Sequence, residues 1–166
     1  MKRLPTIRQI DWVSVILQIV PFGLIAMPFY SANLPSWWLR SAAVYLLLTL
    51  VLHASIPRYH RKGIAFINQG NYVEAIDWFE QSYAFFQKNI WIDRYRYLVL
   101  LSISAISYRE MALCNIAFLW GQLGDGVQSM HYYQQALIEF PNSVIANSGL
   151  RLLKSMENLD DKNEVP

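Results

Sequence analysis

Two long apolar stretches follow each other near the N-terminus, and they constrain the fold more than any other feature. The first, Trp12 to Tyr30, has about 19 residues without a formal charge, close to the roughly 20 residues that an α-helix needs to cross a bilayer. The second runs from Trp37 to Ile56 and begins with tryptophans that suit the boundary between water and lipid. A short polar turn, Ser31 to Ser36, connects them. The sequence therefore predicts a transmembrane helical hairpin over residues 11–56.

The basic residues near these stretches predict an orientation. Cations precede the first stretch and follow the second, whereas the connecting turn has none. They are Lys2, Arg3, Arg8, Arg58, Arg61 and Lys62. Because basic residues collect on the cytoplasmic side of membrane helices, we expect a multi-pass membrane protein with both termini in the cytoplasm, of the bacterial inner-membrane type. Residues 1–10 then form a basic N-terminal segment before the hairpin.

Other interpretations of the apolar stretches stay open. Pro21 and Gly23 lie in the middle of the first stretch, so it is a kinked span or, alternatively, a re-entrant or interfacial segment. A cleaved signal peptide is a further alternative, although Tyr30 to Ala32 lacks the small-x-small pattern of a cleavage site. The third alternative buries both stretches in a soluble bundle. Their basic flanks argue against it, and a hydrophobic fraction of 54% indicates that part of the chain faces lipid.

Charge and cysteine content argue against several classes of function. The formal net charge is only +2, and the cations cluster near the ends of the apolar stretches instead of forming one basic stripe. This distribution argues against a nucleic-acid partner. Cys114 is the only cysteine, which excludes an internal disulfide. Because it lies beside the apolar stripe of a predicted helix, we expect a buried structural thiol and not a nucleophile.

The segment from Met111 to Asn142 has the pattern of two short helices that fold back on each other. Its first apolar stripe has the i, i+3, i+4, i+7 spacing of one helix face. This stripe consists of Leu113, Ile116, Ala117 and Trp120. Gly124 and Asp125 favour a helix end followed by a new helix cap. A second stripe, made of Met130, Tyr133, Ala136 and Leu137, precedes Pro141, which ends the run.

This pattern resembles a tetratricopeptide repeat, whose consensus has W-x2-L-G-x2-Y, then A-x3-F and a closing proline. The matching positions are Leu113, Ile116, Ala117 and Trp120 in the first helix, then Ser129, Tyr133, Ala136 and Pro141. An earlier copy has Tyr59, Lys62, Gly63 and Phe66, the turn Gln69 to Asn71, and then Ala75, Phe79 and Ser82. The resemblance implies an all-α fold, with a short α-solenoid that docks other proteins.

The resemblance also divides the chain after the hairpin. A helical domain over residues 57–156 contains two repeats, at about 57–89 and 110–142. Gly63 and Ala117 align and are 54 residues apart, whereas the spacing in this family is 34 residues. An insertion must therefore separate the two repeats.

The insertion is placed at about residues 90–109, where no glycine or proline interrupts a helix. We expect one long helix here that continues into Met111. A third membrane span is the alternative, but its uncharged part, Tyr97 to Tyr108, has only about 12 residues. A capping helix is predicted at about 143–156, and the polar tail at 157–166 is predicted to be disordered.

The predicted docking surface is the concave face that the first helix of each repeat forms in this family. By helical position it contains His60, Ile64, Ile67, Cys114, Phe118, Gly121 and Gln122. This face lacks the lysine, asparagine and arginine set with which family members bind the C-termini of chaperones, so we expect a different protein or peptide partner. Alternatively, Ile64, Ile67 and Phe118 pack on the inserted helix and leave no groove.

The sequence contains no pattern that indicates catalysis. The histidines are His53, His60 and His131, and none lies in a metal-binding or catalytic motif. Helix-spaced carboxylates such as Asp77 and Glu80 are typical of a solvated face. We therefore expect no enzyme activity, no cofactor and no metal. A membrane enzyme that uses His53 and His60 is the alternative, which their double alanine variant would test.

A membrane-anchored scaffold or assembly factor that binds a partner protein or peptide through its repeats is the predicted function. The alternative is a small structural subunit of a membrane complex, whose transmembrane hairpin is the main partner-binding element. Solenoids generally need about three repeats, and this chain has two and a cap. The inserted helix, formation of a homo-oligomer, or docking on another membrane protein must therefore supply further packing.

Overall fold

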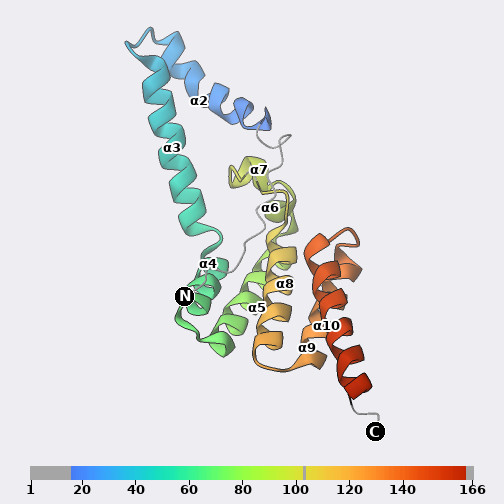
Figure 1. Ribbon diagram of the computed structural model, residues 1–166. Helices are drawn as coiled ribbons and strands as arrows, with labels where there is room; N and C mark the ends of the chain where they lie inside the picture. Colours follow the sequence, from blue (N-terminus) through green and yellow to red (C-terminus); the bar gives the residue numbers. More distant parts are fainter. Residues whose placement is uncertain (1–15, 103, 164–166) are drawn as a thin grey trace. The chain divides into compact units, whose positions relative to one another are not determined.

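The computed structural model describes residues 16–102 and 104–163. Within these ranges the protein is all-helical (Figure 1), which confirms the all-α part of the predicted fold class for them. The chain divides into two compact units. The first unit is Met1–Pro57 with Asn89–Ser107, and the second unit is Arg58–Lys88 with Tyr108–Pro166. The predicted basic segment at residues 1–10 and the start of the predicted first span, residues 12–15, lie outside the described residues.

In the first unit, two apolar helices are consecutive in the chain and pack together. Helix α2 spans Ile19–Ser31 and helix α3 spans Trp37–Ser55. Ser36, the residue before α3, lies in the left-handed region at φ 55°, and the short connection reverses the chain. The rings of Phe22 and Tyr45 meet edge to face with their centroids 5.7 Å apart. Aromatic packing of this kind stabilises the contact between α2 and α3.

The side chains of α2 and α3 are mostly exposed. In the most apolar 18-residue window of α3, only 6% is buried. Among the described residues, α3 is the one helix that is long and apolar enough to cross a membrane. Helix α2 is also apolar but has only 13 residues, fewer than a complete span needs. Length and composition therefore support one membrane span here and do not support the predicted multi-pass arrangement.

The segment from residue 90 to 107 is not the long helix that the sequence predicted. It forms two short helices, α6 (Ile90–Arg94) and α7 (Arg96–Val99). The next helix begins only at Tyr108. Between them, Leu101 lies in the left-handed region at φ 51°, a conformation that interrupts a right-handed helix. The prediction of a continuous helix through residues 90–109 is therefore wrong.

Polar side chains explain this break. The Arg96 guanidinium donates to the backbone carbonyls of Asp93 (3.1 Å), Ser104 (2.9 Å) and Ala105 (2.6 Å). The Ser104 hydroxyl accepts from the backbone N–H of Ile106 at 3.3 Å. Serine hydroxyls compete in this way with the hydrogen bonds of a helix. Residues 90–107 contain neither glycine nor proline, so the usual helix breakers do not indicate this break.

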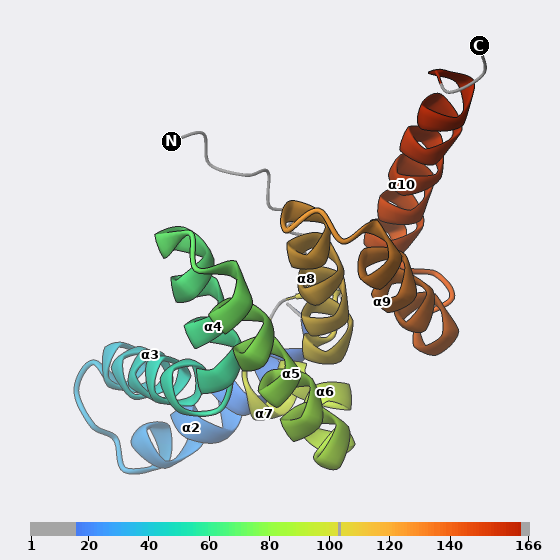
Figure 2. The same ribbon diagram turned by 90° about the horizontal axis from the view of Figure 1, so that it is seen from below.

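The second unit contains five helices within the described residues, packed in series (Figures 1 and 2). They are α4 (Arg58–Gln69), α5 (Tyr72–Lys88), α8 (Tyr108–Gln122), α9 (Gly126–Glu139) and α10 (Val144–Asn163). Helix α4 packs on α5, α5 on α8, α8 on α9, and α9 on α10. The contact between α5 and α8 forms although residues 89–107 separate these helices in the chain.

The helix pairs α4–α5 and α8–α9 have equivalent positions 54 residues apart. Each pair turns at a glycine with positive φ, Gly70 at 80° and Gly124 at 84°, where a residue without a Cβ is favoured. Buried residues match at the same offset. The matched pairs are Gly63 and Ala117, Ala75 and Ser129, Phe79 and Tyr133, and Ser82 and Ala136. The second unit therefore contains an internal repeat of a helix pair.

Helix α10 is longer than the predicted capping helix. It follows Ser143, whose hydroxyl accepts from the backbone N–H of Ala146 at 3.2 Å, as an N-cap residue does. A helix end near residue 156 and a disordered tail at 157–166 were predicted, but α10 continues to Asn163. The residues from 157 to 163 contain no glycine or proline, so no helix breaker acts there. Residues 164–166 lie outside the described residues.

Candidate protein-binding surface

A buried cluster between α4, α5 and α8 joins the two helix pairs. It consists of Ala75, Ile76, Phe79, Ala112, Ile116 and Leu119. Gly63 on α4 lies against this cluster, because a Cβ at Gly63 would come within 2.8 Å of the Phe79 ring. That separation is too short for two carbon atoms that are not bonded. The glycine therefore permits the close approach of α4 to α5.

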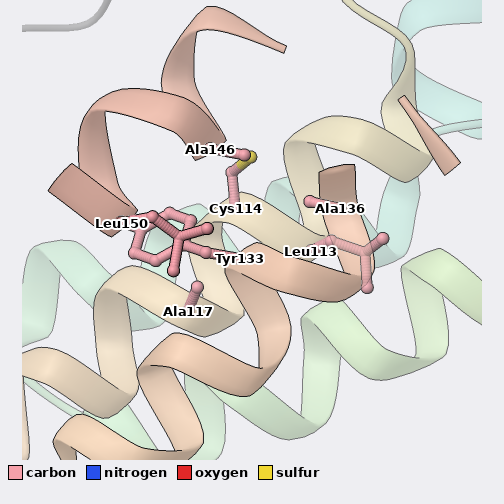
Figure 3. Close-up of a cluster of buried hydrophobic side chains, with 7 residues drawn as sticks. All are labelled: Leu113, Cys114, Ala117, Tyr133, Ala136, Ala146 and Leu150. Carbon is pink, nitrogen blue, oxygen red and sulfur yellow. The ribbon is translucent and has the colours of Figure 1, made fainter. Parts of the chain in front are cut away.

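A second buried cluster lies between α8, α9 and α10 (Figure 3). It consists of Leu113, Cys114, Ala117, Tyr133, Ala136, Ala146 and Leu150. Figure 3 shows the Cys114 sulfur next to Ala146 of α10. Burial, and then the charge of Glu110, raise the pKa of the Cys114 thiol to about 12, so the group is a neutral thiol at pH 7. Cys114 is therefore a packing residue, as its position beside the apolar stripe predicted.

Two residues of the predicted docking surface, His60 and Cys114, are buried. The His60 ring meets the rings of Phe79 and Tyr108 edge to face, with centroids 5.0 and 5.4 Å apart. Its Nδ1 atom has no hydrogen-bond partner among the described residues. Burial lowers the pKa of His60 to about 4, because the apolar surroundings disfavour the imidazolium. Neither His60 nor Cys114 presents a side chain that a docked peptide could reach.

The other predicted surface residues are more accessible, to different degrees. Ile64 on α4 and Gln122 on α8 are exposed. Ile67 and Phe118 are half-buried and pack on the cluster between α4, α5 and α8. Gly121 is exposed but lies close to α9, because a Cβ there would be 3.3 Å from the Ser129 hydroxyl. Ile64 and Gln122 are thus the members of the predicted set best placed to contact a partner.

A polar cluster links α5, α8 and α9 on the surface of the second unit. The Tyr83 hydroxyl donates to Glu139, and Arg109 forms an ion pair with the same carboxylate at 3.3 Å. Arg109 also donates to the Gln87 side chain at 2.9 Å. This cluster was not predicted from the sequence, because Tyr83 and Glu139 lie 56 residues apart and no local pattern pairs them.

Four aromatic rings form a continuous row along one face of α4 and α5, which we call the aromatic ladder. In spatial order its rings are Phe66, Trp78, Tyr59 and Phe85, with centroids of neighbours 6.4, 6.1 and 6.0 Å apart. Two cations cover its faces. The Lys62 ammonium lies 4.0 Å from the Trp78 centroid, and the Arg58 guanidinium lies 4.9 Å from that of Tyr59. These distances are typical of cation–π contacts.

The part of the chain that the structure describes contains no group of three or more His, Cys, Asp or Glu side chains that could hold a metal ion. Comparison with protein-family models and with curated proteins finds no match for this chain. The candidate binding surfaces are therefore the exposed helix faces of the second unit and the exposed apolar helices of the first unit.

Proposed function

We propose that this protein is a membrane-anchored helical scaffold that binds a partner protein or peptide through the second unit. One observation carries the proposal: the chain joins an exposed apolar helix of membrane-spanning length, α3, to a unit with its own buried clusters. An exposed apolar helix requires an apolar environment, because transfer of its side chains from water is favourable. The second unit buries its apolar residues itself and presents helix faces to a partner.

The anchor in this proposal is a hairpin in which α2 and α3 both enter the bilayer. The short connection between them carries no charged residue, and basic residues precede α2 and follow α3. Exposed side chains on α2, such as Leu24 and Met27, favour contact with lipid. The distribution of cations favours a location of both termini in the cytoplasm.

The repeat resemblance supports the docking role of the second unit. The equivalent positions at an offset of 54 residues and the positive-φ glycines of both turns agree with two tetratricopeptide-like helix pairs. Helix α10 packs on the second pair, as a capping helix does. The partner would contact the exposed side of α4 and α8, where Ile64 and Gln122 lie.

Photocrosslinking in intact cells tests this proposal. A photoreactive amino acid replaces Ile64 or Gln122 on the second unit, Val44 in α3, or Val127 as a control on α9. All four side chains are exposed. The scaffold proposal predicts that the same distinct protein is captured from Ile64 and Gln122, and not from Val127. Absence of this protein adduct at both positions, with the chain in the membrane, would contradict it.

The second candidate is a subunit whose hairpin is the main partner-binding element, and the exposed surface of α3 favours it. Capture of a protein from Val44 alone would support this candidate. Replacement of residues 11–56 by an unrelated two-helix anchor separates the candidates further. The scaffold should retain its partner after the exchange, whereas a subunit that binds through its hairpin should lose it.

A further inference from the structure

Charge is unevenly distributed along the α4–α5 pair. Helix α4 contains Arg58, Arg61 and Lys62 in its first half, all exposed, and no acidic residue. The two helices are antiparallel, because Tyr59 near the start of α4 meets Phe85 near the end of α5. Lys88, at the end of α5, therefore lies at the same end of the pair as these three cations.

The acidic residues of the pair lie toward its other end. Glu74 is in the first turn of α5, beside the turn that connects the helices, and Asp77 follows it. Glu80, in the middle of α5, accepts a hydrogen bond from Tyr132 of α9 at 2.9 Å. One end of the α4–α5 pair is thus cationic. The aromatic ladder extends from this end along the same helices.

The cationic end is also the end that follows the apolar helix in the chain. Helix α3 ends at Ser55 and α4 begins at Arg58, so only Ile56 and Pro57 separate them. Tryptophan and tyrosine side chains are enriched at the level of lipid headgroups, and the ladder contains Trp78 and Tyr59. Basic clusters immediately cytoplasmic of a membrane helix attract anionic lipids.

We propose that the cationic end of the α4–α5 pair and the aromatic ladder bind the headgroups of anionic phospholipids. This inference rests on the proposed membrane anchor. The cations attract the phosphate, and the half-buried rings provide an amphipathic surface at the interface between water and lipid. The role of the ladder is then to hold the first helix pair at the bilayer surface, while Ile64 and the α8 face serve the protein partner.

The full chain in nanodiscs of phosphatidylcholine with one fifth phosphatidylglycerol tests the inference. A photoreactive phenylalanine derivative replaces Phe85, and mass spectrometry identifies the crosslinked lipids. The ratio of phosphatidylglycerol to phosphatidylcholine among the adducts should exceed the ratio of the two lipids in the bilayer, and this excess is the enrichment. Each cation near an anionic surface is worth about a five-fold change in binding, so Arg58→Gln with Lys62→Gln should lower the enrichment at least about five-fold.

Two matched double variants separate charge from structure. Arg58→Lys with Lys62→Arg keeps both charges and should keep the enrichment. Arg151→Gln with Lys154→Gln removes two charges from exposed positions of α10 and should also keep it. Thermal unfolding of each variant confirms that the second unit is folded. Two results would overturn the inference. One is that adducts of the chain with native Arg58 and Lys62 match the bilayer composition. The other is that the enrichment survives the substitution of Arg58 and Lys62 by glutamine.

The same photoreactive position in intact cells tests the protein alternative. The contrary result is that position 85 captures a protein and no lipid, and that this protein adduct disappears when Arg58 and Lys62 are replaced by glutamine. That result would assign this face to an acidic protein and overturn the inference. Carbonate extraction separates this failure from failure of the anchor. A chain that stays in the membrane but shows no lipid enrichment disproves only the lipid site, whereas a chain released by carbonate disproves the anchor.

Discussion

Helices α3 and α8 are both rich in large apolar residues, yet their environments are opposite. Ser41 is the only buried residue of α3, whereas seven of the 15 residues of α8 are buried. Helix α8 packs on α5 and α9 and also meets α10. In the first unit, α2 is the helix on which α3 packs extensively. The difference lies in the neighbouring helices and not in the number of apolar residues.

The comparison shows what apolar composition can and cannot predict. Burying a large aliphatic side chain is worth roughly 1.5–3 kcal/mol, so each such side chain requires either a protein core or a lipid environment. In α8, packing partners that lie more than 30 residues away in the chain, such as Phe79, supply the core. In α3, leucines such as Leu46 and Leu47 remain exposed, which is the basis for proposing that lipid surrounds them.

The largest expected effect is on the stability of the second unit, when the same leucine-to-alanine substitution is made in α8 and in α3. Leu119 of α8 is fully buried and Leu47 of α3 is 63% exposed. Leu119→Ala should destabilise the second unit by about 2–5 kcal/mol, because it leaves a cavity, whereas Leu47→Ala should change its stability by less than about 0.5 kcal/mol. Hydrogen exchange of the α8 amides measures both effects. Equal losses of stability would show that α3 belongs to the same packed core.

A charged substitution tests the lipid environment of α3. An arginine near the centre of a membrane helix costs about 3 kcal/mol on insertion scales, so Leu47→Arg should strongly reduce the carbonate-resistant fraction of the chain. The matched control is Leu152→Arg on α10, because Leu152 is similarly exposed at 62%. This control should remain carbonate-resistant. Full retention of the Leu47 variant would contradict a bilayer location for α3.

His60 should make the stability of the second unit depend on pH. Burial holds its pKa at about 4, below the ordinary value of 6.5, so the unfolded chain binds the proton more tightly. Stability should therefore be constant above pH 6.5 and fall as the pH decreases toward 4, by about 3 kcal/mol in total. Hydrogen exchange of α8 amides in the wild type and in His60→Leu isolates this contribution. Identical pH profiles for the two proteins would show that His60 is not buried.

Substitution of two glycines by alanine, one crowded and one in open space, tests the close approach of α4 and α5. Gly63→Ala would place a Cβ within 2.8 Å of the Phe79 ring, and such overpacking typically costs about 1–3 kcal/mol. Gly126 of α9 has open space around it, so Gly126→Ala should be neutral or slightly stabilising. Thermal unfolding of the two variants provides the comparison. A neutral Gly63→Ala would show that the two helices are farther apart.

Local patterns were sufficient to predict that helices form in the second unit, although not where α8 begins or where α10 ends. The stripe with Leu113 and Ala117 predicted α8, and Gly124 with Asp125 predicted the turn, where the Asp125 side chain accepts from the backbone N–H of Gln128 at 2.8 Å. These features depend on neighbours within one or two helical turns. Sequence reasoning detects them because helix periodicity and capping are local properties.

Features that depend on distant residues were not predictable in the same way. The break between α7 and α8 depends on the Arg96 guanidinium and its three backbone partners, which no composition rule indicates. The burial of Cys114 follows from its position on the helix, but its contact with Ala146 depends on how α10 packs. The aromatic ladder joins Tyr59 and Phe66 of α4 to rings on α5, so it emerges only once the register of the two helices is known.

The most direct test compares two exposed apolar side chains in the full chain in liposomes. Nitroxide labels replace Leu47 of α3 and Ile138 of α9, which are 63% and 81% exposed, in a chain with Cys114→Ala. A membrane-spanning α3 predicts that the label at 47 collides mainly with oxygen and the label at 138 mainly with a water-soluble nickel complex. Equal access of the nickel complex to both labels would contradict the membrane anchor.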